Sequence, residues 1–582
     1  MRPQLLHLVR LIALVFLIGV LAGCGSYQAP NLTVAVTPAA AAVASGQTTQ
    51  FSAAITGDSS GVTWKATAGT IDANGLYTAP TDSQSSTQTI TATSKKDMTK
   101  AASAIVHVVV PGQVTPTANL QVAQYSISPA GQGKVSVQFG LDTNYGLTTW
   151  QQPIPQGGGT VSLFVAGMKA SSLYHMRGIV EFDDNAQFAD ADQTFTTGDI
   201  PAAQLPALTV TTTTGLTPQS GVELLDLIGG TTQLTLAVSD LAGNMLWGYD
   251  SALPGIFANP IKLLPNGHFL MNFSGVSPDG MNSVLREVDL AGTTIWEMKA
   301  ADLNNALATA TCAGCNIKVI GTHHDFAVLP NGHLIVIAGQ IQTISGTAIT
   351  GDVLIDLDQN HKPVWLWNEF DFLDTNRRPM GFPDWTHTNA VIYSPDDGNL
   401  IISIRHQNWL VKVPYTNGNG SGPPIWKLGY QGDFSLIGGS DPIDWFYAQH
   451  GPSFTTTNTT GNFSLILFDN GNDRGFPTPC GTTGQPACYS TVPLLQLDEM
   501  AKTATLKFHP KAPTFSFFGG NAAVLKNGNV EFCESAGGPG TAGDIYEVTQ
   551  DSSATIVWKM LITGQFAYRG QRIPSLYPGV QW

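Results

Sequence analysis

Charged side chains are scarce in this sequence, at 12% of 582 residues, and no long run carries one sign. The formal net charge is −15, which argues against nucleic acid as a partner because no basic cluster would meet the phosphates. Gly and Pro are abundant instead, at 61 and 35 residues, and Thr and Ser recur throughout. This profile excludes a mainly helical chain and predicts an all-β protein with several domains.

Long apolar runs are also lacking. The run from Leu11 to Ala22 follows Arg2 and Arg10, and at about 1.5 Å per residue it covers about 18 Å of a hydrocarbon core of about 30 Å. It ends in LAGC, which resembles a bacterial lipobox, so residues 1–23 are predicted to be a lipoprotein signal peptide. A lipidated Cys24 would anchor an exported protein to a membrane, and the following glycine favours the outer membrane, facing the periplasm.

Cysteine is rare as well. Cys480 and Cys488 bracket a loop of Gly, Thr and Pro, while Cys312 and Cys315 form TCAGCN. In an oxidising compartment each pair predicts a local disulfide. A zinc site would need two more ligands, and no Cys or His pair follows at metal spacing, so we predict no metal. Cys533 is left over and is predicted to be a buried thiol.

Two β modules are predicted to precede the main domain. Residues 24–112 alternate apolar and polar residues with turns about every ten residues, and GVTW and GLYTAP resemble a bacterial immunoglobulin-like domain of group 2. Residues 113–200 contain KVSVQFGLD and QTFTTG, which resemble a fibronectin type III domain with Tyr174 in its core. Neither module contains a catalytic grouping, so we interpret both as spacers and expect a chain starting near residue 200 to fold.

The remainder, 201–582, repeats. A tight turn before an apolar strand recurs with a spacing of 63 to 67 residues at Gly267, Gly332, Gly398, Gly461 and Gly528. A second signature, an alternating strand with a turn and an aromatic residue, recurs six times, for example in EVDLAGTTIW. The repeat predicts a six-bladed β-propeller, closed by a strand taken from the tail AYRGQRIPSLYP.

Histidines mark one position of this repeat. His323 and His324, then His387, then His450 lie eight to eleven residues ahead of the turn glycine of three successive units. A single such histidine is typical of a strand-start cap, but the symmetry of a propeller would superimpose all three positions around one axis. Arg405, on the strand after His387, would join them.

At these residues the chain resembles the bacterial arylsulfotransferase family, which moves a sulfuryl group between phenols without a nucleotide sulfate donor. The segments that carry the resemblance are HHDFAVLPNG, WTHTNAVIYSPDDGNLIISIRHQNWLVKV, YAQHGPSF and YRGQRIPSLYP. The resemblance implies that His450 becomes sulfated, that His387, Asn389 and Arg405 bind sulfate, and that His324 beside Asp325 is a further active-site histidine. A lysine of the family has no recognisable counterpart here, since Lys507 and Lys526 lack its context.

The implied chemistry is sulfuryl transfer in two steps through a sulfohistidine, with no cofactor. Its partners are a small aromatic sulfate donor and a phenolic acceptor, with His324, oriented by Asp325, protonating the leaving oxygen and His323 a further substrate-binding candidate. The expected apolar wall for the aromatic rings consists of Trp385, Trp445, Phe446 and Tyr447.

Two other classes stay open from the sequence. One is a propeller binding or scaffold lipoprotein without turnover, and the other is a metal-dependent propeller lyase or lactonase that uses His324, Asp325, His387 and His450 as ligands. The donor, the acceptor and the oligomeric state, with a homodimer as one option, are not determined by the sequence.

Overall fold

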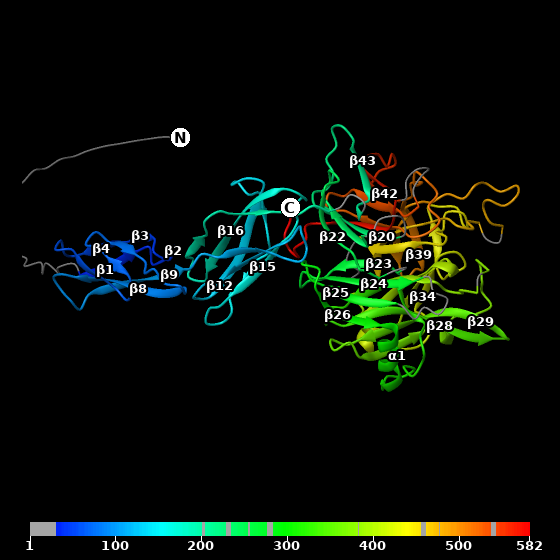
Figure 1. The fold of residues 1–582 in the computed structure, drawn as a ribbon. Helices are drawn as coiled ribbons and strands as arrows, with labels where there is room; N and C mark the ends of the chain where they lie inside the picture. The colour runs from blue at the N-terminus through cyan, green and yellow to red at the C-terminus, as the bar shows by residue number, and fades with distance from the viewer. Residues whose placement is uncertain are drawn as a thin grey trace, which may run out of the picture. The chain divides into compact units, whose positions relative to one another are not determined.

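The structure is a computed structural model (Figure 1). It describes residues 31–582 except 201–203, 229–233, 254–255, 276–282, 382, 456–460, 476–477 and 537–542. The chain is nearly all β, with 49% of residues in strands and 4% in helices, which confirms the predicted all-β class. It divides into two compact units, Met1–Val109 and Val110–Trp582. The signal peptide and Cys24 lie outside the described residues.

The described part of the first unit, residues 31–109, contains three sheets. Its core includes the strand residues Tyr77, Ile90 and Val106 and also Phe51 between β3 and β4, all of which are fully buried. The sheets, in pairing order, are β1 (Thr33–Thr37) with β4 (Ser52–Thr56); β2 (Ala40–Ala44), β9 (Ala101–Val109), β8 (Ser86–Ser94) and β5 (Val62–Ala66); and β3 (Thr48–Gln50), β7 (Leu76–Thr78) and β6 (Thr70–Ile71).

The second unit begins with two further sheets. Tyr174 lies in the core between them and accepts a hydrogen bond from the Lys169 backbone at 3.1 Å. The first sheet consists of β10 (Gln113–Pro116), β11 (Ala123–Ile127) and β15 (Val161–Val165). The second consists of β12 (Gly133–Gly140), β13 (Leu147–Thr148), β14 (Gln152–Pro153), β16 (Leu173–Phe182), β17 (Gln187–Ala189) and β18 (Gln193–Thr196).

In the described part of residues 204–582 the strands form six further sheets. The first three are β22 (Met245–Tyr249), β21 (Leu236–Ser239), β20 (Val222–Ile228) and β44 (Phe566–Ile573); β23 (Ile256–Leu263), β24 (Phe269–Gly275), β25 (Val284–Val288) and β26 (Thr294–Lys299); and β27 (Gly321–Val328), β28 (Leu334–Ile344), β29 (Thr347–Leu357) and β30 (Pro363–Asn368).

The other three are β31 (Thr388–Ser394), β32 (Asn399–Ile404), β33 (Trp409–Val413) and β34 (Trp426–Leu428); β36 (His450–Phe454), β37 (Asn462–Phe468), β38 (Leu494–Asp498), β39 (Thr503–Phe508) and β35 (Ser435–Ile437); and β40 (Asn521–Val524), β41 (Val530–Glu534), β42 (Gly543–Val548), β43 (Ile556–Thr563) and β19 (Ala207–Thr212). Short helices connect some strands: α1 (Ala300–Thr309), α2 (Glu369–Phe372) and the 3-10 turns η2 (Arg405–Gln407) and η3 (Thr416–Gly418).

The five turn glycines that carry the repeat all adopt a positive φ, from 68° to 86°, which side chains with a Cβ rarely tolerate. The first strands of neighbouring sheets contact one another in the order β23, β27, β31, β36 and β40, and β44 contacts both β23 and β41. The contacts between neighbouring sheets therefore run from the first sheet through the other five and back to the first.

A strand from each end of this region pairs with a strand from the opposite end of the region. β44 pairs with β20, and β19 pairs with β43, so the first and last sheets each combine early and late segments. Arg572 on β44 reinforces the closure, because its guanidinium pairs with Glu223 at 2.8 Å, Glu547 at 3.0 Å and Glu531 at 3.5 Å. All four side chains are almost fully buried.

The segment after β44 packs against the second β module. The Tyr577 hydroxyl accepts from the backbone N–H of Ala166 at 2.7 Å and donates to the Phe164 carbonyl at 2.9 Å. The Trp582 indole donates to the Thr148 carbonyl at 3.0 Å, and its ring occupies the space that a Cβ at Gly167 would need. Residues 113–200 therefore share buried contacts with the tail of the six-sheet region, which the spacer interpretation did not anticipate.

Two disulfides are formed by the cysteine pairs identified from the sequence, Cys312 with Cys315 and Cys480 with Cys488. Cys533 is the free cysteine among the described residues, and it is buried. Among these residues, no helix has the length and apolar character needed to cross a membrane.

Candidate active site

All four candidate histidines lie on or next to the first strands of three consecutive sheets, and His323 and His324 share one strand. His324 is on β27, His387 directly precedes β31, and His450 begins β36. Each of these strands has a β-bulge close to its histidine, and His324 and His387 have positive φ values of 58° and 52°. A bulge re-aims a side chain relative to the sheet. The repeated bulge therefore turns three imidazoles away from the sheet faces and toward one centre.

The structure brings these rings together. The ring centroids of His324 and His387 are 4.5 Å apart, and the Tyr568 ring on β44 is 6.1 Å from His324 and 6.2 Å from His450. Burial and the neighbouring cationic groups lower the pKa of both His324 and His450 well below the ordinary value. Both imidazoles are therefore neutral near pH 7.

Asn470 sets the tautomer of His450. The Asn470 amide nitrogen donates to the carbonyls of Ser516 at 2.8 Å and Gly519 at 3.0 Å, which leaves its oxygen to face His450 Nδ1 at 2.6 Å. Since an amide oxygen only accepts, Nδ1 carries the hydrogen and the lone pair of His450 is on Nε2. This is the form that a nucleophilic imidazole requires.

Arg405 lies in η2 with its guanidinium held from two sides. Nη2 donates to the Phe517 carbonyl at 3.1 Å, and Nη1 donates to His406 Nε2 at 2.6 Å. Its Nε is buried without an acceptor among the described residues. A buried N–H group without an acceptor is costly, so it is suited to meet an anionic ligand.

His387 and His406 share Asp384. The Asp384 carboxylate accepts from His387 Nδ1, its backbone carbonyl accepts from His406 Nδ1 at 2.6 Å, and the two rings stack with centroids 4.5 Å apart. Burial, followed by the charges of His387 and Arg405, lowers the pKa of His406 to about 3.

These three residues are also the cluster that could hold a metal ion. Both nitrogens of His406 are already occupied, Nδ1 by a carbonyl and Nε2 by the Arg405 guanidinium. A metal would have to displace that guanidinium and then lie beside its charge. This cluster therefore fits a metal ion poorly. The ligand set expected for a metal-dependent lyase or lactonase was a different one, His324, Asp325, His387 and His450, and of these Asp325 is paired with Lys262 and Arg569.

Asn389 and Asp325 face different partners from those expected. The Asn389 side chain donates to the Gln449 carbonyl at 2.7 Å, and its own oxygen is buried without a donor among the described residues. The Asp325 carboxylate binds Lys262 at 2.7 Å and Arg569 at 3.2 Å. The expectation that Asp325 orients His324 is therefore not met, because the carboxylate holds two cations instead.

Arg569 connects this carboxylate to the histidine centre. Its Nη2 also donates to the backbone carbonyl of Asn389 at 3.1 Å, and its charge lowers the pKa of His450. A cavity of about 200 Å³ borders Arg569, Lys262 and Asp325. Burial raises the pKa of Asp226, in the same cavity, to about 7.

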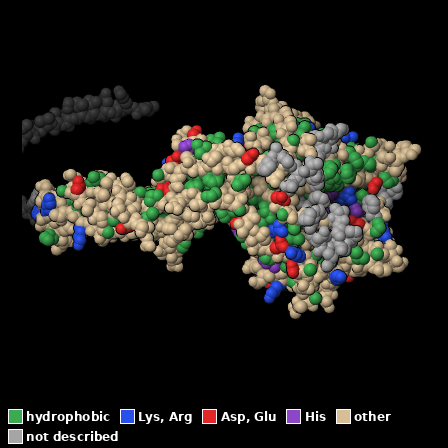
Figure 2. All heavy atoms as spheres, viewed as in Figure 1, with side chains coloured by type: hydrophobic (Ala, Val, Ile, Leu, Met, Phe, Trp, Pro, Cys, Tyr) green, Lys and Arg blue, Asp and Glu red, His purple; other side chains and the backbone are tan. Residues whose placement is uncertain are grey.

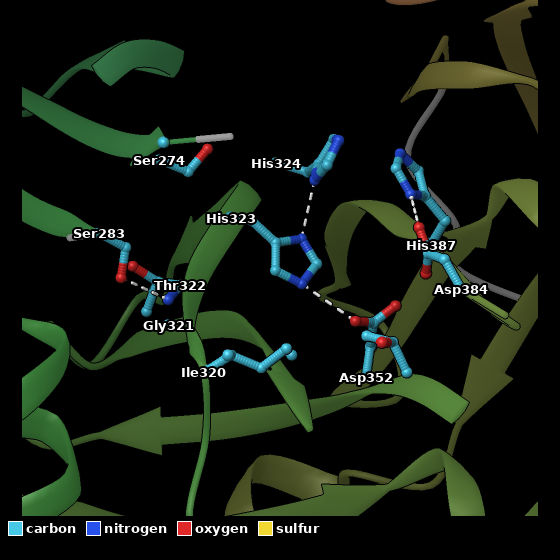
Figure 3. Close-up of a pocket in the computed structure, with 13 residues that line it drawn as sticks. Ser274, Ser283, Ile320, Gly321, Thr322, His323, His324, Asp352, Asp384 and His387 are labelled. Carbon is cyan, nitrogen blue, oxygen red and sulfur yellow. Dashed lines mark hydrogen bonds and ion pairs between the residues drawn. The ribbon is translucent and has the colours of Figure 1, made fainter. Parts of the chain in front are cut away.

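A second cavity of about 200 Å³ is lined by the imidazoles of His323, His324 and His387 (Figure 3). Ser274, Ser283 and Thr322 line one side, and His323, His324 and His387 line the other with Asp352 and Asp384 behind them. In Figure 2 histidine, basic and acidic side chains are visible together on the face of the six-sheet region.

The expected aromatic wall is part of the core. Trp385, Trp445, Phe446 and Tyr447 have at most 1% of their surface exposed. Phe517, whose carbonyl binds Arg405, is the aromatic residue that does face solvent here, with 51% of its surface exposed.

Sequence reasoning missed four residues of the site: Tyr568, Arg569, His406 and Asn470. The first two lie in the tail segment AYRGQRIPSLYP, which was assigned only a closing strand, and His406 adjoins Arg405. No sequence pattern pointed to Asn470, because its role depends on a loop that brings it next to His450 at the start of β36. Lys262 binds the Asp325 carboxylate and lines the cavity beside Arg569, whereas Lys507 and Lys526 are exposed.

His324, His387 and His450 thus lie together beside Arg405 and Arg569, an arrangement suited to an anionic ligand. Residues 214–569 match the family model described as Arylsulfotransferase (ASST), which is more than half of the chain. The chain belongs to this family.

No curated protein matches the chain. Among solved structures it is similar to a mutant apocarotenoid oxygenase of Synechocystis, with 10% identity, a TM-score of 0.30 and coverage of 80% of this chain and 95% of that one. It is also similar to an endo-1,5-alpha-L-arabinanase of Thermotoga petrophila, with 12% identity, a TM-score of 0.23 and coverage of 68% and 96%.

Proposed function

We propose that the protein is an aryl-sulfate sulfotransferase that works without a nucleotide sulfate donor. It takes a sulfuryl group from a phenolic sulfate ester and passes it to an acceptor phenol through a sulfohistidine at His450. The observation that carries the proposal is the neutral His450 with Nδ1–H fixed by Asn470, beside the unsatisfied Nε of Arg405.

In the first step the lone pair on His450 Nε2 attacks sulfur. The N–S bond forms while the bond from sulfur to the aryl oxygen breaks, and the oxygen leaves with the electron pair. The sulfuryl oxygens carry spread negative charge in the transition state, as in phosphoryl transfer, and the forked guanidinium of Arg405 suits them. His387 is held by Asp384, which leaves its Nε2 to face the same oxygens.

In the second step an acceptor phenol attacks the sulfohistidine and restores His450. Asn389 fits a less direct role than donation to sulfate, because its side-chain amide binds the Gln449 carbonyl next to His450 while its backbone carbonyl accepts from Arg569. We interpret it as a residue that positions both flanks of the nucleophile.

The contacts and closing strands of the six sheets support a closed six-bladed propeller with this site at its axis. We further propose that residues 24–112 and 113–200 are immunoglobulin-like and fibronectin type III-like sandwiches. The LAGC segment supports a lipoprotein anchored through Cys24, in the outer membrane and facing the periplasm. Cys24→Ala should release the protein from membranes or block its processing, and a cleaved variant that still fractionates with membranes would contradict the anchor.

The test of the function is transfer from 4-nitrophenyl sulfate to phenol by the purified protein with a chelator present. His450→Ala should fold normally and lose turnover by several orders of magnitude, because no other group forms the covalent intermediate. His175→Ala is the matched control, since His175 pairs with Asp192 in the second β module. Donor alone should add about 80 Da to the peptide that contains His450. Finding that mass on His324 or His387, or full activity in the variant, would overturn the assignment.

A further inference from the structure

His323 sits behind His324, outside the group of rings that would meet the sulfuryl group. Its Nδ1 is 2.8 Å from His324 Nδ1, and its Nε2 is 3.0 Å from the Asp352 carboxylate (Figure 3). His323 is on β27 and Asp352 is on β29, two strands away. Gly339 on the intervening β28 lies beside this contact, at a position where a Cβ would be 3.5 Å from His323 Nε2.

Asp352 is rigidly held as the acceptor. It receives hydrogen bonds from the Thr386 hydroxyl at 2.9 Å and the Thr388 backbone at 2.6 Å. Glu369 lies beside it, and burial together with the Asp352 charge raises the pKa of Glu369 well above its ordinary value. The folded protein therefore favours the protonated form of Glu369 beside the Asp352 carboxyl group.

We propose that Asp352, His323 and His324 form a proton relay that protonates the leaving aryl oxygen, an inference that rests on the proposed sulfuryl transfer. Asp352 fixes His323 with Nε2–H toward the carboxylate. The second hydrogen of a protonated His323 then points at His324 Nδ1. His324 must accept there, so its hydrogen is on Nε2.

The charges around the pair agree with this assignment. Burial lowers the pKa of His323, but Asp352, with a smaller contribution from Asp384, raises it above the ordinary value overall. His324 faces His387, His450 and Arg405, and with burial these lower its pKa, so it carries a single hydrogen.

The transfer balances at each atom. As the bond from sulfur to the aryl oxygen breaks, the oxygen takes the hydrogen from His324 Nε2, and His324 Nδ1 takes the hydrogen from His323 Nδ1. His323 is left neutral, still donating to Asp352. In the second half-reaction the acceptor phenol gives its proton to His324 Nε2, and the hydrogen on His324 Nδ1 returns to His323.

The relay matters most when the leaving oxygen is basic. His323→Gln should slow transfer from phenyl sulfate by on the order of 10² to 10⁴-fold, and from 4-nitrophenyl sulfate far less, because the nitro group stabilises the departing phenolate. His333→Gln is the matched control, since His333 makes a similar contact to Asp356 at 3.0 Å outside the site, and it should change neither rate. An equal loss with both donors would mean that His323 only supports the fold, and would overturn the relay.

A second measurement needs no activity. The ¹⁵N spectrum of the histidines in the intact protein should show His323 doubly protonated and His324 with hydrogen on Nε2 near pH 7, and Asp352→Asn should make His323 neutral. A hydrogen on His324 Nδ1 would overturn the relay even if transfer occurs. If the unaltered protein transfers sulfate from neither donor, the proposed function fails while the spectrum still decides the protonation pattern.

Discussion

His406 Nε2 accepts a hydrogen bond from Arg405 Nη1 at 2.6 Å, while His406 Nδ1 donates to the Asp384 carbonyl at 2.6 Å. The carbonyl can only accept, so the tautomer is fixed and the acceptor nitrogen faces the guanidinium. His406 therefore fixes the orientation of the Arg405 guanidinium while its own imidazole is neutral.

We expect His406→Phe to keep the stacking on His387 but lose the acceptor, lowering kcat/KM by roughly 10 to 100-fold, as expected for about 1.5 to 3 kcal/mol of a hydrogen bond to a charged group. His406→Gln retains an acceptor and should recover much of the loss. In an Arg405→Lys background the same change should have little further effect, and fully additive losses would show that His406 does not act through Arg405.

In Asn470→Ala the hydrogen of His450 should no longer be confined to Nδ1, because Nδ1–H loses its acceptor. The fraction of His450 with its lone pair on Nε2 then falls, so single-turnover formation of the sulfohistidine should slow by about 10-fold or more. Asn244→Ala, at an exposed turn, is the control. Unchanged burst kinetics in Asn470→Ala would contradict the role of the amide.

The cluster around Arg572 predicts a pH effect on stability. Burial and the neighbouring Glu223 raise the pKa of Glu531 well above its ordinary value, so the folded protein favours the protonated form. The stabilisation is complete below the unfolded pKa, about 4.3, and is lost as the pH rises through the raised pKa of the folded state. Glu531→Gln should reduce the fall in the urea midpoint between about pH 5 and about pH 8. A midpoint with the same pH dependence as the unaltered protein would refute this prediction.

The tail contacts predict which truncation is tolerated. A chain that begins at residue 110 keeps the second β module and should retain both its melting temperature and its activity. A chain that begins at residue 201 exposes Tyr577 and Trp582, and it should melt earlier or aggregate. Tyr577→Phe in the full chain should cost about 1 to 3 kcal/mol, because the Ala166 N–H loses its acceptor. Equal melting temperatures for the two truncated chains would show that the module is dispensable.

The repeat could be predicted because each unit needs a turn glycine before an apolar strand, and all five glycines have the positive φ that such turns require. The same periodicity placed His324, His387 and His450 in register. Contacts between segments far apart in the chain left no such pattern, so Asn470 and Arg569 were not found.

Two errors have physical reasons. Aromatic residues near strand starts were expected to line the site, but Trp385 and Trp445 pack between sheets, where large rings fill the most volume. Asp325 was paired with its neighbour His324, but the β-bulge between Thr322 and Phe326 interrupts the regular strand there, and the carboxylate meets Lys262 and Arg569 instead.

Because β44 contributes Tyr568 and Arg569 to the same centre as His324 and His387, the site is distributed over more than two hundred residues of the chain. No partly synthesised chain contains it, and neither does a chain in which the last strand has yet to pair with β20. Activity should therefore appear in one step when the ring closes, which makes transfer itself a kinetic report on the final folding event.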